Sequence, residues 1–246
     1  MRLTLDHVII RAGDVHAALE ELVARTGLPV LAPPTPVAGM TSAVLSAGGV
    51  DVELLQVGGE PPPQPVGYGL GFTADRPLED AMAALRALGI PTSAPARAEV
   101  KHGGDLRRWR AVQVGGLLAD PFPMPMSTRA PGRRDRVMER VGAATIRLPG
   151  VGAMATRRAG GSMVVVTEYG FDAAAARRAA GDGPRVTSVT VGVAGHEDAW
   201  RRLPLDASSP LRLDESATGV TRVALTRVAG VPAGQLRLGD VVFEVV

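Results

Sequence analysis

The feature that most constrains the fold of this 246-residue chain is a repeated unit of strand, helix and glycine stop. An apolar run at 3–10 is followed by a helical segment that begins after Asp14 and stops at Gly27. The same order returns with an apolar run at 67–74 and a helical segment that stops at Gly89. A unit that recurs in this way is one supersecondary element used more than once. Two such copies, facing each other, can enclose a cavity that neither copy forms alone.

Further strands are expected after each helix. In the first copy they lie at 41–47 and 50–57, on either side of a Gly-Gly turn. In the second copy they lie at 92–100, 108–114 and 121–128. Prolines at 121, 123 and 125 confine the last of these strands to a sheet edge or an irregular path, because proline cannot donate to a ladder.

The pattern divides the chain into four parts. The first module occupies 1–59 and the second 66–128, and a degenerate third module occupies 184–246. Between them, 129–183 forms a linker with extra strands, including 162–168, and a short helix capped by Asp172. The expected fold class is α+β.

Composition excludes several classes of function. The chain has no cysteine, which excludes disulfides and thiolate chemistry, and its net charge is only +2. The basic stretch at 129–140 lacks interleaved aromatics, so a solvated linker is favoured over a nucleic-acid partner. No apolar run is long enough to span a membrane, and the charged N-terminus is unlike a signal peptide, so a cytoplasmic location is expected.

Two further segments of the first module carry a resemblance to a known family. They read Leu5-Asp6-His7-Val8-Ile9-Ile10 and Gly49-Val50-Asp51-Val52-Glu53-Leu54-Leu55. Together with the helix between them, they resemble the first half of a vicinal oxygen chelate protein. That superfamily includes the glyoxalases, the fosfomycin- and bleomycin-resistance proteins and the extradiol dioxygenases. The resemblance covers roughly residues 3–128 and is closest to the glyoxalase-like group.

The resemblance implies paired βαβββ modules whose curved sheets wrap a cleft. It also implies that a histidine on the first strand and a glutamate on the last strand of each module bind one divalent metal ion. His7 and Glu53 match the first pair. Alternation along a strand places Glu53 on one face with Asp51 and Leu55, and His7 on one face with Leu5 and Ile9.

The second pair of ligands is missing from the sequence. The position that corresponds to His7 by its distance from the helix is Tyr68, and the expected last strand carries Met124 between prolines where a glutamate would stand. Tyr68, Trp109 and Met124 are expected to line the substrate cleft. Two protein ligands are too few for a tight zinc site, which takes three and a water, although Glu99 or His102 could complete it.

Three outcomes follow: a reduced or loop-completed metal site, a metal-free pocket in which His7 and Glu53 act as acid and base, or a binding role alone. The leading hypothesis is a glyoxalase-like isomerase, lyase or cyclase that acts on an oxygen-rich small metabolite by proton transfer. Glu53 would be the base, and His7 the acid or metal ligand. The alternatives are a protein that sequesters a small drug or natural product and an interaction domain that forms a homodimer. The glycines at 67, 69 and 71 do not match a nucleotide-binding fingerprint, so no nucleotide cofactor is expected.

Overall fold

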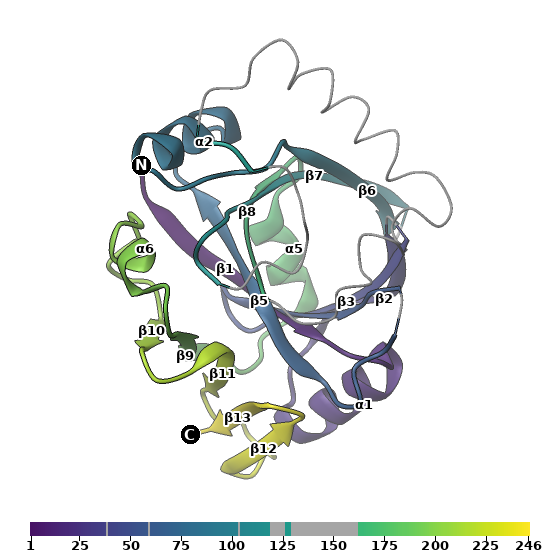
Figure 1. Cartoon of the computed structure of the whole chain (residues 1–246). Coiled ribbons are helices and arrows are strands. Elements are labelled where there is room, and N and C mark those ends of the chain that lie inside the picture. Colours follow the sequence, from purple (N-terminus) through teal and green to yellow (C-terminus); the bar gives the residue numbers. More distant parts are fainter. Residues whose placement is uncertain (38, 59, 103, 119–125, 129–161) are drawn as a thin grey trace.

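The computed structural model describes residues 1–37, 39–58, 60–102, 104–118, 126–128 and 162–246 (Figure 1). These residues form two sheets. The larger has eight strands in the order β2-β3-β4-β1-β5-β8-β7-β6, and the smaller has five in the order β10-β9-β11-β13-β12. With few helices beside two mixed sheets, the fold class is α+β, as expected.

The first half of the large sheet is one βαβββ module. Its elements are β1 Leu3–Arg11, α1 Val15–Thr26, β2 Val30–Val37, β3 Met40–Leu45 and β4 Asp51–Gln56. β1 pairs with β4 in parallel and β3 joins β4 to β2. Helix α1 begins where Asp14 Oδ1 accepts from the backbone N–H of Ala17 at 3.0 Å. It ends at Gly27, whose φ of 71° favours glycine.

The second half repeats this arrangement with a long insertion. Its elements are β5 Val66–Ala74, α2 Leu78–Ala87, β6 Ala96–His102, β7 Asp105–Gln113 and β8 Met163–Tyr169. The strand parallel to β5 is β8, which is therefore the last strand of this module. The sequence had placed this segment, at 162–168, in the linker as an extra strand. The strand expected at 121–128 lies mostly outside the described residues; of its described part, Ser127 forms an isolated bridge with Thr92.

The C-terminal unit has its own topology. Its elements are β9 Val186–Val193, α6 Glu197–Arg201, β10 Leu211–Asp214, β11 Thr218–Leu225, β12 Gly234–Leu238 and β13 Val241–Val245. A βαβββ module would place its first and last strands side by side, whereas here β9 lies between β10 and β11. The central β9–β11 pair is antiparallel, and each of its strands has a parallel outer neighbour, as in the β1–β5 pair. The unit therefore resembles a reduced pair of half-modules more than one degenerate module.

The large sheet curls until its edge strands meet. Figure 1 shows the strands wrapped almost into a barrel, and β2 at one edge contacts β6 at the other. Outside the barrel, α1 packs on β3 and β4, and α2 packs on β7 and β8. This leaves the outer face of the central pair, β1 and β5, for the C-terminal sheet.

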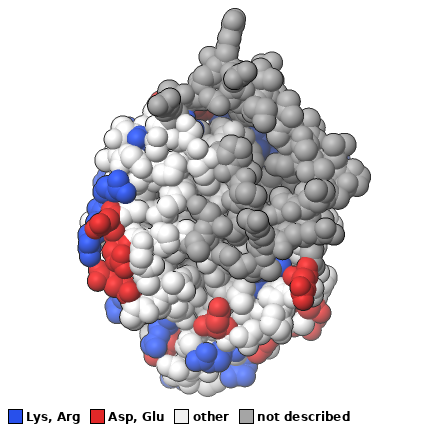
Figure 2. Space-filling view, viewed as in Figure 1, with Lys and Arg blue, Asp and Glu red and all other residues white. Residues whose placement is uncertain are grey.

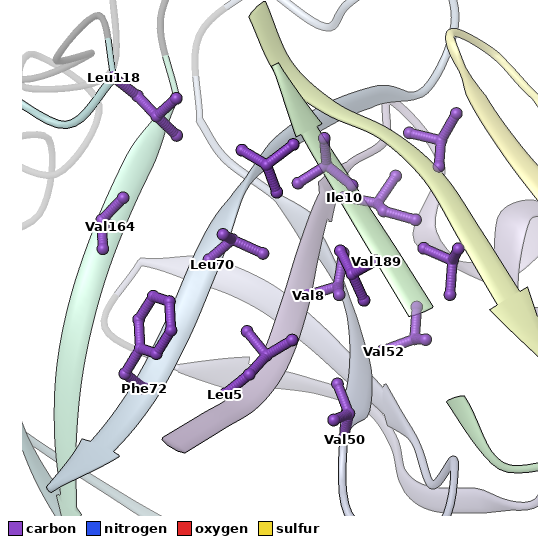
Figure 3. Packing of buried hydrophobic residues seen from close by; sticks show 14 of the residues in the cluster. Leu5, Val8, Ile10, Val50, Val52, Leu70, Phe72, Leu118, Val164 and Val189 are labelled. Carbon is purple, nitrogen blue, oxygen red and sulfur yellow. The ribbon is translucent and has the colours of Figure 1, made fainter. Parts of the chain in front are cut away.

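The core between the two sheets is built from aliphatic side chains. Val8, Ile10 and Leu70 on the central pair pack against Val189 of β9, and all four are completely buried (Figure 3). The two sheets approach closely at Gly67, where an added Cβ would lie 2.1 Å from the carbonyl oxygen of Val220. Glycine is required at this position because the backbone of β11 occupies the space of a side chain.

Trp200 joins the C-terminal unit to the second module. It is 1% exposed, its Nε1–H donates to the carbonyl of Leu117 at 2.6 Å, and its ring lies 6.4 Å from that of Phe72.

Replacing Trp200 with Ala should lower the free energy of unfolding by about 3–5 kcal/mol, because it leaves a large cavity and an unpaired carbonyl. Urea denaturation followed by circular dichroism measures this change. Leu213→Ala, at a 41% exposed position, is the control and should have little effect; equal effects of the two variants would contradict the packing.

Candidate active site

Two hollows among the described residues have similar sizes but differ in the polarity of their walls. One, of about 480 Å³, lies on the face of the C-terminal sheet that points away from the core and is lined mainly by charged and hydroxyl side chains. Its carboxylates are already engaged, since Asp214 accepts from Ser216 and Glu244 pairs with Arg222 at 3.1 Å. Figure 2 shows acidic and basic side chains interspersed over the lower part of the described surface. This hollow has the character of a solvated sheet face.

The other hollow, of about 430 Å³, is the interior of the barrel. Both modules and the helix α5 Ala173–Ala180 contribute to its wall. Most of its lining is apolar, and its size fits a small organic molecule. The apolar lining includes Ile9, Leu31, Val37, Met40, Val44, Leu55, Val100, Trp109, Met163, Val165 and Phe171. The polar lining includes His7, Ser42, Asp51, Glu53, Ser93, Arg97, Arg107, Gln113, Thr167, Tyr169 and Arg177.

His7 reaches this interior through an irregularity in β1. The pairing of β1 with β5 jumps from Leu5–Phe72 to His7–Gly71, which makes Asp6 an extra residue. A bulge interrupts strict alternation. Leu5 therefore packs in the main core with Val8. The expectation that Leu5 shares a face with His7 is wrong, because the bulge at Asp6 lies between them. The imidazole lies over Gly71, where an added Cβ would come within 1.9 Å of the ring.

Asp6 fixes the orientation of His7. Its Oδ2 lies 2.8 Å from His7 Nδ1 and also accepts from the hydroxyl of Tyr169 at 2.6 Å, while its Oδ1 accepts from Arg177 Nη2 at 2.7 Å. An ionised carboxylate only accepts, so His7 must carry its proton on Nδ1. The other ring nitrogen, Nε2, is then directed toward Glu53.

Glu53 stands on the neighbouring strand, as expected from the alternation of β4. Its Oε2 is 3.7 Å from His7 Nε2, and its Oε1 accepts from the hydroxyl of Ser42 at 2.6 Å. Its side chain is 24% exposed, against 11% for that of His7. The structure thus brings His7 and Glu53 together at the cavity wall, and their chemical roles remain a prediction.

Arg177 enters the site from α5 and neutralises two buried acids. Besides Asp6, it donates from Nε to Asp51 Oδ2 at 2.9 Å. Asp6 is 3% exposed and Asp51 is 5% exposed. Burial of two carboxylates at this depth requires such a partner. The same contacts tie α5 to the mouth of the barrel.

The protonation equilibria of these groups are strongly shifted. Burial alone would raise the pKa of Asp6, but the hydrogen bond and charge of His7, with those of Arg177 and Tyr169, outweigh it and hold the pKa well below its usual range. Burial raises the pKa of Asp51 to about 6, because the charge and hydrogen bond of Arg177 compensate only in part. Burial would lower the pKa of His7, but Asp6, Glu53 and Asp51 together raise it above 6.5.

The three residues expected to bind the substrate lie in different places. Trp109 lines the cavity from β7. Tyr68 does not line it; a second irregularity, between the Ile9–Gly69 and Ile10–Gly67 pairs, accompanies its burial in a small apolar cluster with Ile9 and Val165. Burial there raises the pKa of Tyr68 to about 12. Met124 lies outside the described residues.

The second module lacks the counterparts of His7 and Glu53. Val8 pairs with Val52 in the first module as Leu70 pairs with Val164 in the second, so Gly69 and Val165 occupy the corresponding positions. Glu168, the acidic residue of β8, makes its contacts on the outer face of the sheet. Its Oε1 accepts from the backbone N–H of Leu78 at the start of α2, and its Oε2 pairs with Arg110.

These residues do not fit the four-ligand metal site that the resemblance implies. Within the described ranges, no group of three or more His, Asp or Glu side chains is placed to hold a metal ion. His7 and Glu53 supply two donors, and the nearby carboxylates of Asp6 and Asp51 are bound by the guanidinium of Arg177. A cation at this place would have to compete with that positive charge. Glu99 pairs with Arg108 instead of completing a site.

The coupling between Asp6 and His7 is directly measurable. Because the folded-state pKa of His7 lies above 6.5, its protonation stabilises the fold fully below pH 6.5, and this contribution is lost as the pH rises through the folded-state pKa. Asp6→Asn should lower the pKa of His7 by about one unit or more and flatten this pH dependence. NMR titration of the imidazole Cε1–H measures the shift, and Asp80→Asn, at an exposed position on α2, is the control. An unchanged His7 titration in Asp6→Asn would contradict the assigned contact.

Comparison with known proteins places this geometry in a known fold. No protein-family model and no curated protein matches the chain. Among solved structures, a hypothetical protein from Staphylococcus aureus superimposes with a TM-score of 0.63 at 9% identity, covering 100% of this chain and 99% of the other. A Mn(II)-bound glyoxalase from Novosphingobium aromaticivorans superimposes with a TM-score of 0.53 at 12% identity, covering 99% and 82%.

Identities this low establish the fold and not the activity. The similarity to these two structures agrees with the paired βαβββ modules and the near-closed barrel. No helix among the described residues is long and apolar enough to cross a membrane. The chain therefore has the fold of the vicinal oxygen chelate superfamily.

Proposed function

We propose that the chain is an enzyme that binds a largely apolar small molecule in the barrel and moves a proton on it. The reaction type would be an isomerase, lyase or cyclase. The observation that carries this proposal is the facing pair of Glu53 Oε2 and His7 Nε2 at 3.7 Å, on the wall of an otherwise mostly apolar cavity. An acid and a base on one wall are what a proton shift requires.

Asp6 prepares His7 for this role. With Nδ1–H donating to Asp6, the neutral ring presents a basic Nε2 and the protonated ring presents an Nε2–H donor. The raised pKa of His7 favours the protonated ring, which is the acid form. Asp6, Tyr169 and Arg177 act through His7 and are positioning residues.

The steps of an isomerisation balance with these two groups. Glu53 takes a proton from a substrate carbon next to a carbonyl, and the C–H electron pair moves toward the carbonyl oxygen. The imidazolium of His7 returns a proton at another position of the substrate. Transfer of the proton from Glu53 to His7 Nε2 then restores the starting state.

The cavity favours a different substrate from the one that the resemblance implies. An oxygen-rich metabolite would leave many polar groups against aliphatic and aromatic walls, at a cost of about 1–3 kcal/mol for each unpaired group. A largely apolar molecule with one or two oxygen atoms suits the lining better. The low polarity also strengthens the electrostatic interactions that assist proton transfer.

The second candidate function is sequestration of an apolar compound without chemistry. Val165, at one position of the missing ligand pair, favours it, because it contributes apolar surface to the cavity but no functional group. Such a protein would bind its ligand stoichiometrically and leave it unchanged.

Hydrogen–deuterium exchange distinguishes these functions. A panel of apolar ketones that carry a second oxygen at the opposite end of the molecule, including 6-methoxy-2-acetylnaphthalene, is incubated with the protein in D2O, and exchange at the carbon beside the carbonyl is followed by NMR. The wild type should accelerate exchange for at least one ketone. Glu53→Gln should reduce that rate by about 100-fold or more, because it removes the base and keeps the size of the side chain.

The matched control is Glu21→Gln, which makes the same change at an exposed position on α1. It should exchange at the wild-type rate. Exchange that persists at the wild-type rate in Glu53→Gln would exclude Glu53 as the base. Ketone binding without any accelerated exchange in the wild type would favour sequestration.

A further inference from the structure

One line of paired residues crosses the inner face of the large sheet. His7 pairs with Gly71, Gly71 with Val165, and Val165 with Gln113. Because the His7 ring covers Gly71, the side chains along this line are the imidazole, Val165 and the Gln113 amide. His7, Val165 and Gln113 all line the cavity. The line therefore has a reactive group at one end and an amide at the other, with an apolar side chain between.

The Nε2 group of Gln113 is buried and has no hydrogen-bond partner among the described residues. Gln113 is 7% exposed, and its Nε2 makes no hydrogen bond in the described structure. The backbone N–H of Gln113 donates to Ser93 Oγ at 2.9 Å, so the place of this residue in the sheet does not depend on its side chain. A buried N–H group without an acceptor costs about 1–3 kcal/mol.

We infer that Gln113 is a specificity-determining residue that donates a hydrogen bond to an acceptor oxygen of the ligand, such as a carbonyl, at the end of the cavity opposite His7. This inference rests on the proposed function, and it narrows the ligand to an apolar molecule with an acceptor at a fixed distance from the reacting carbon. The last torsion of a glutamine side chain is soft, so the amide can turn its N–H group to the ligand without moving the strand.

Selectivity follows from the same unpaired group. A ligand with an acceptor satisfies the amide, whereas a hydrocarbon of the same shape leaves it buried and unpaired. A site built to hydrogen-bond its ligand rejects an analogue without the partner atom for this reason. Replacement of the amide by an apolar group should remove the discrimination.

The test compares two near-isosteric compounds, 2-acetylnaphthalene and 2-isopropenylnaphthalene, which differ by an oxygen in place of a CH2 group. Their affinities for the full chain are measured by isothermal titration calorimetry. The wild type should bind the ketone about tenfold or more tightly than the hydrocarbon. Gln113→Met, which keeps the length of the side chain, should bind the two within about twofold of each other. Gln56→Met, at an exposed position on β4, should retain the wild-type preference.

A second readout does not depend on ligand. If the amide has no protein partner, Gln113→Met should melt at or above the wild-type temperature, because it removes a buried unpaired group. A lower melting temperature would show that the amide supports the fold and would overturn the inference.

The binding outcomes separate this inference from the proposed function. Equal affinities for the two compounds in the wild type would overturn the role of Gln113 and leave the proton-transfer proposal standing, since exchange at Glu53 is measured independently. A preference for the ketone that persists in Gln113→Met would mean that another protein group donates to the ligand oxygen. That result would also overturn the inference. Failure of both compounds to bind the wild type would overturn this inference and the apolar ligand class together.

Discussion

The double ion pair of Arg177 is the interaction on which the interior of the barrel depends. Asp6 and Asp51 are buried in a mostly apolar wall, where an isolated carboxylate would be protonated or would unfold its surroundings. One guanidinium reaches both, at 2.7 and 2.9 Å. Its planar fork suits two acceptors in a way that an ammonium does not. Asp6 can then remain ionised, and only an ionised Asp6 both orients His7 and raises its pKa.

The two acids nevertheless differ, and the difference follows from their donors. Asp6 receives hydrogen bonds from His7, Tyr169 and Arg177, which offset its burial. The Oδ1 atom of Asp51 has no partner in the described structure, so burial prevails and its pKa is raised. The hydrogen-bond donors of the network are therefore directed mainly at Asp6, and Asp51 is the acid that becomes protonated more readily. The two modules contribute differently to the cavity: the first supplies His7 and Glu53, and the second supplies Val165 and the amide of Gln113.

The sequence predicted the parts of this arrangement that are local or repeated. The repeat predicted the strand and helix that open each module, and alternation along β4 placed Glu53 and Asp51 on the cavity face. The last strand of the second module, expected at 121–128, is instead β8. Alternation failed along β1, because the bulge at Asp6 turns Asp6 and His7 toward the same network and returns Leu5 to the core. A bulge depends on pairing with β5, which a single strand does not encode. Tyr169 and Arg177 were beyond prediction for a related reason. They join the site only because β8, after a long insertion, pairs with β5.

The C-terminal sheet, whose role the sequence left open, is explained by the coverage of the barrel. Two helices in paired βαβββ modules lie over β3–β4 and β7–β8, so the outer face of the central strands is left without a layer. Val8, Ile10 and Leu70 on that face would otherwise be exposed to water, at about 1.5–3 kcal/mol for each side chain. The same strands carry His7 and Gly71 on their inner face. A bulge is tolerated in such a pair only if the remaining residues hold the register. The packing of β9 and β11 against the outer face therefore supports the geometry of the site from behind, although none of their residues lines the cavity.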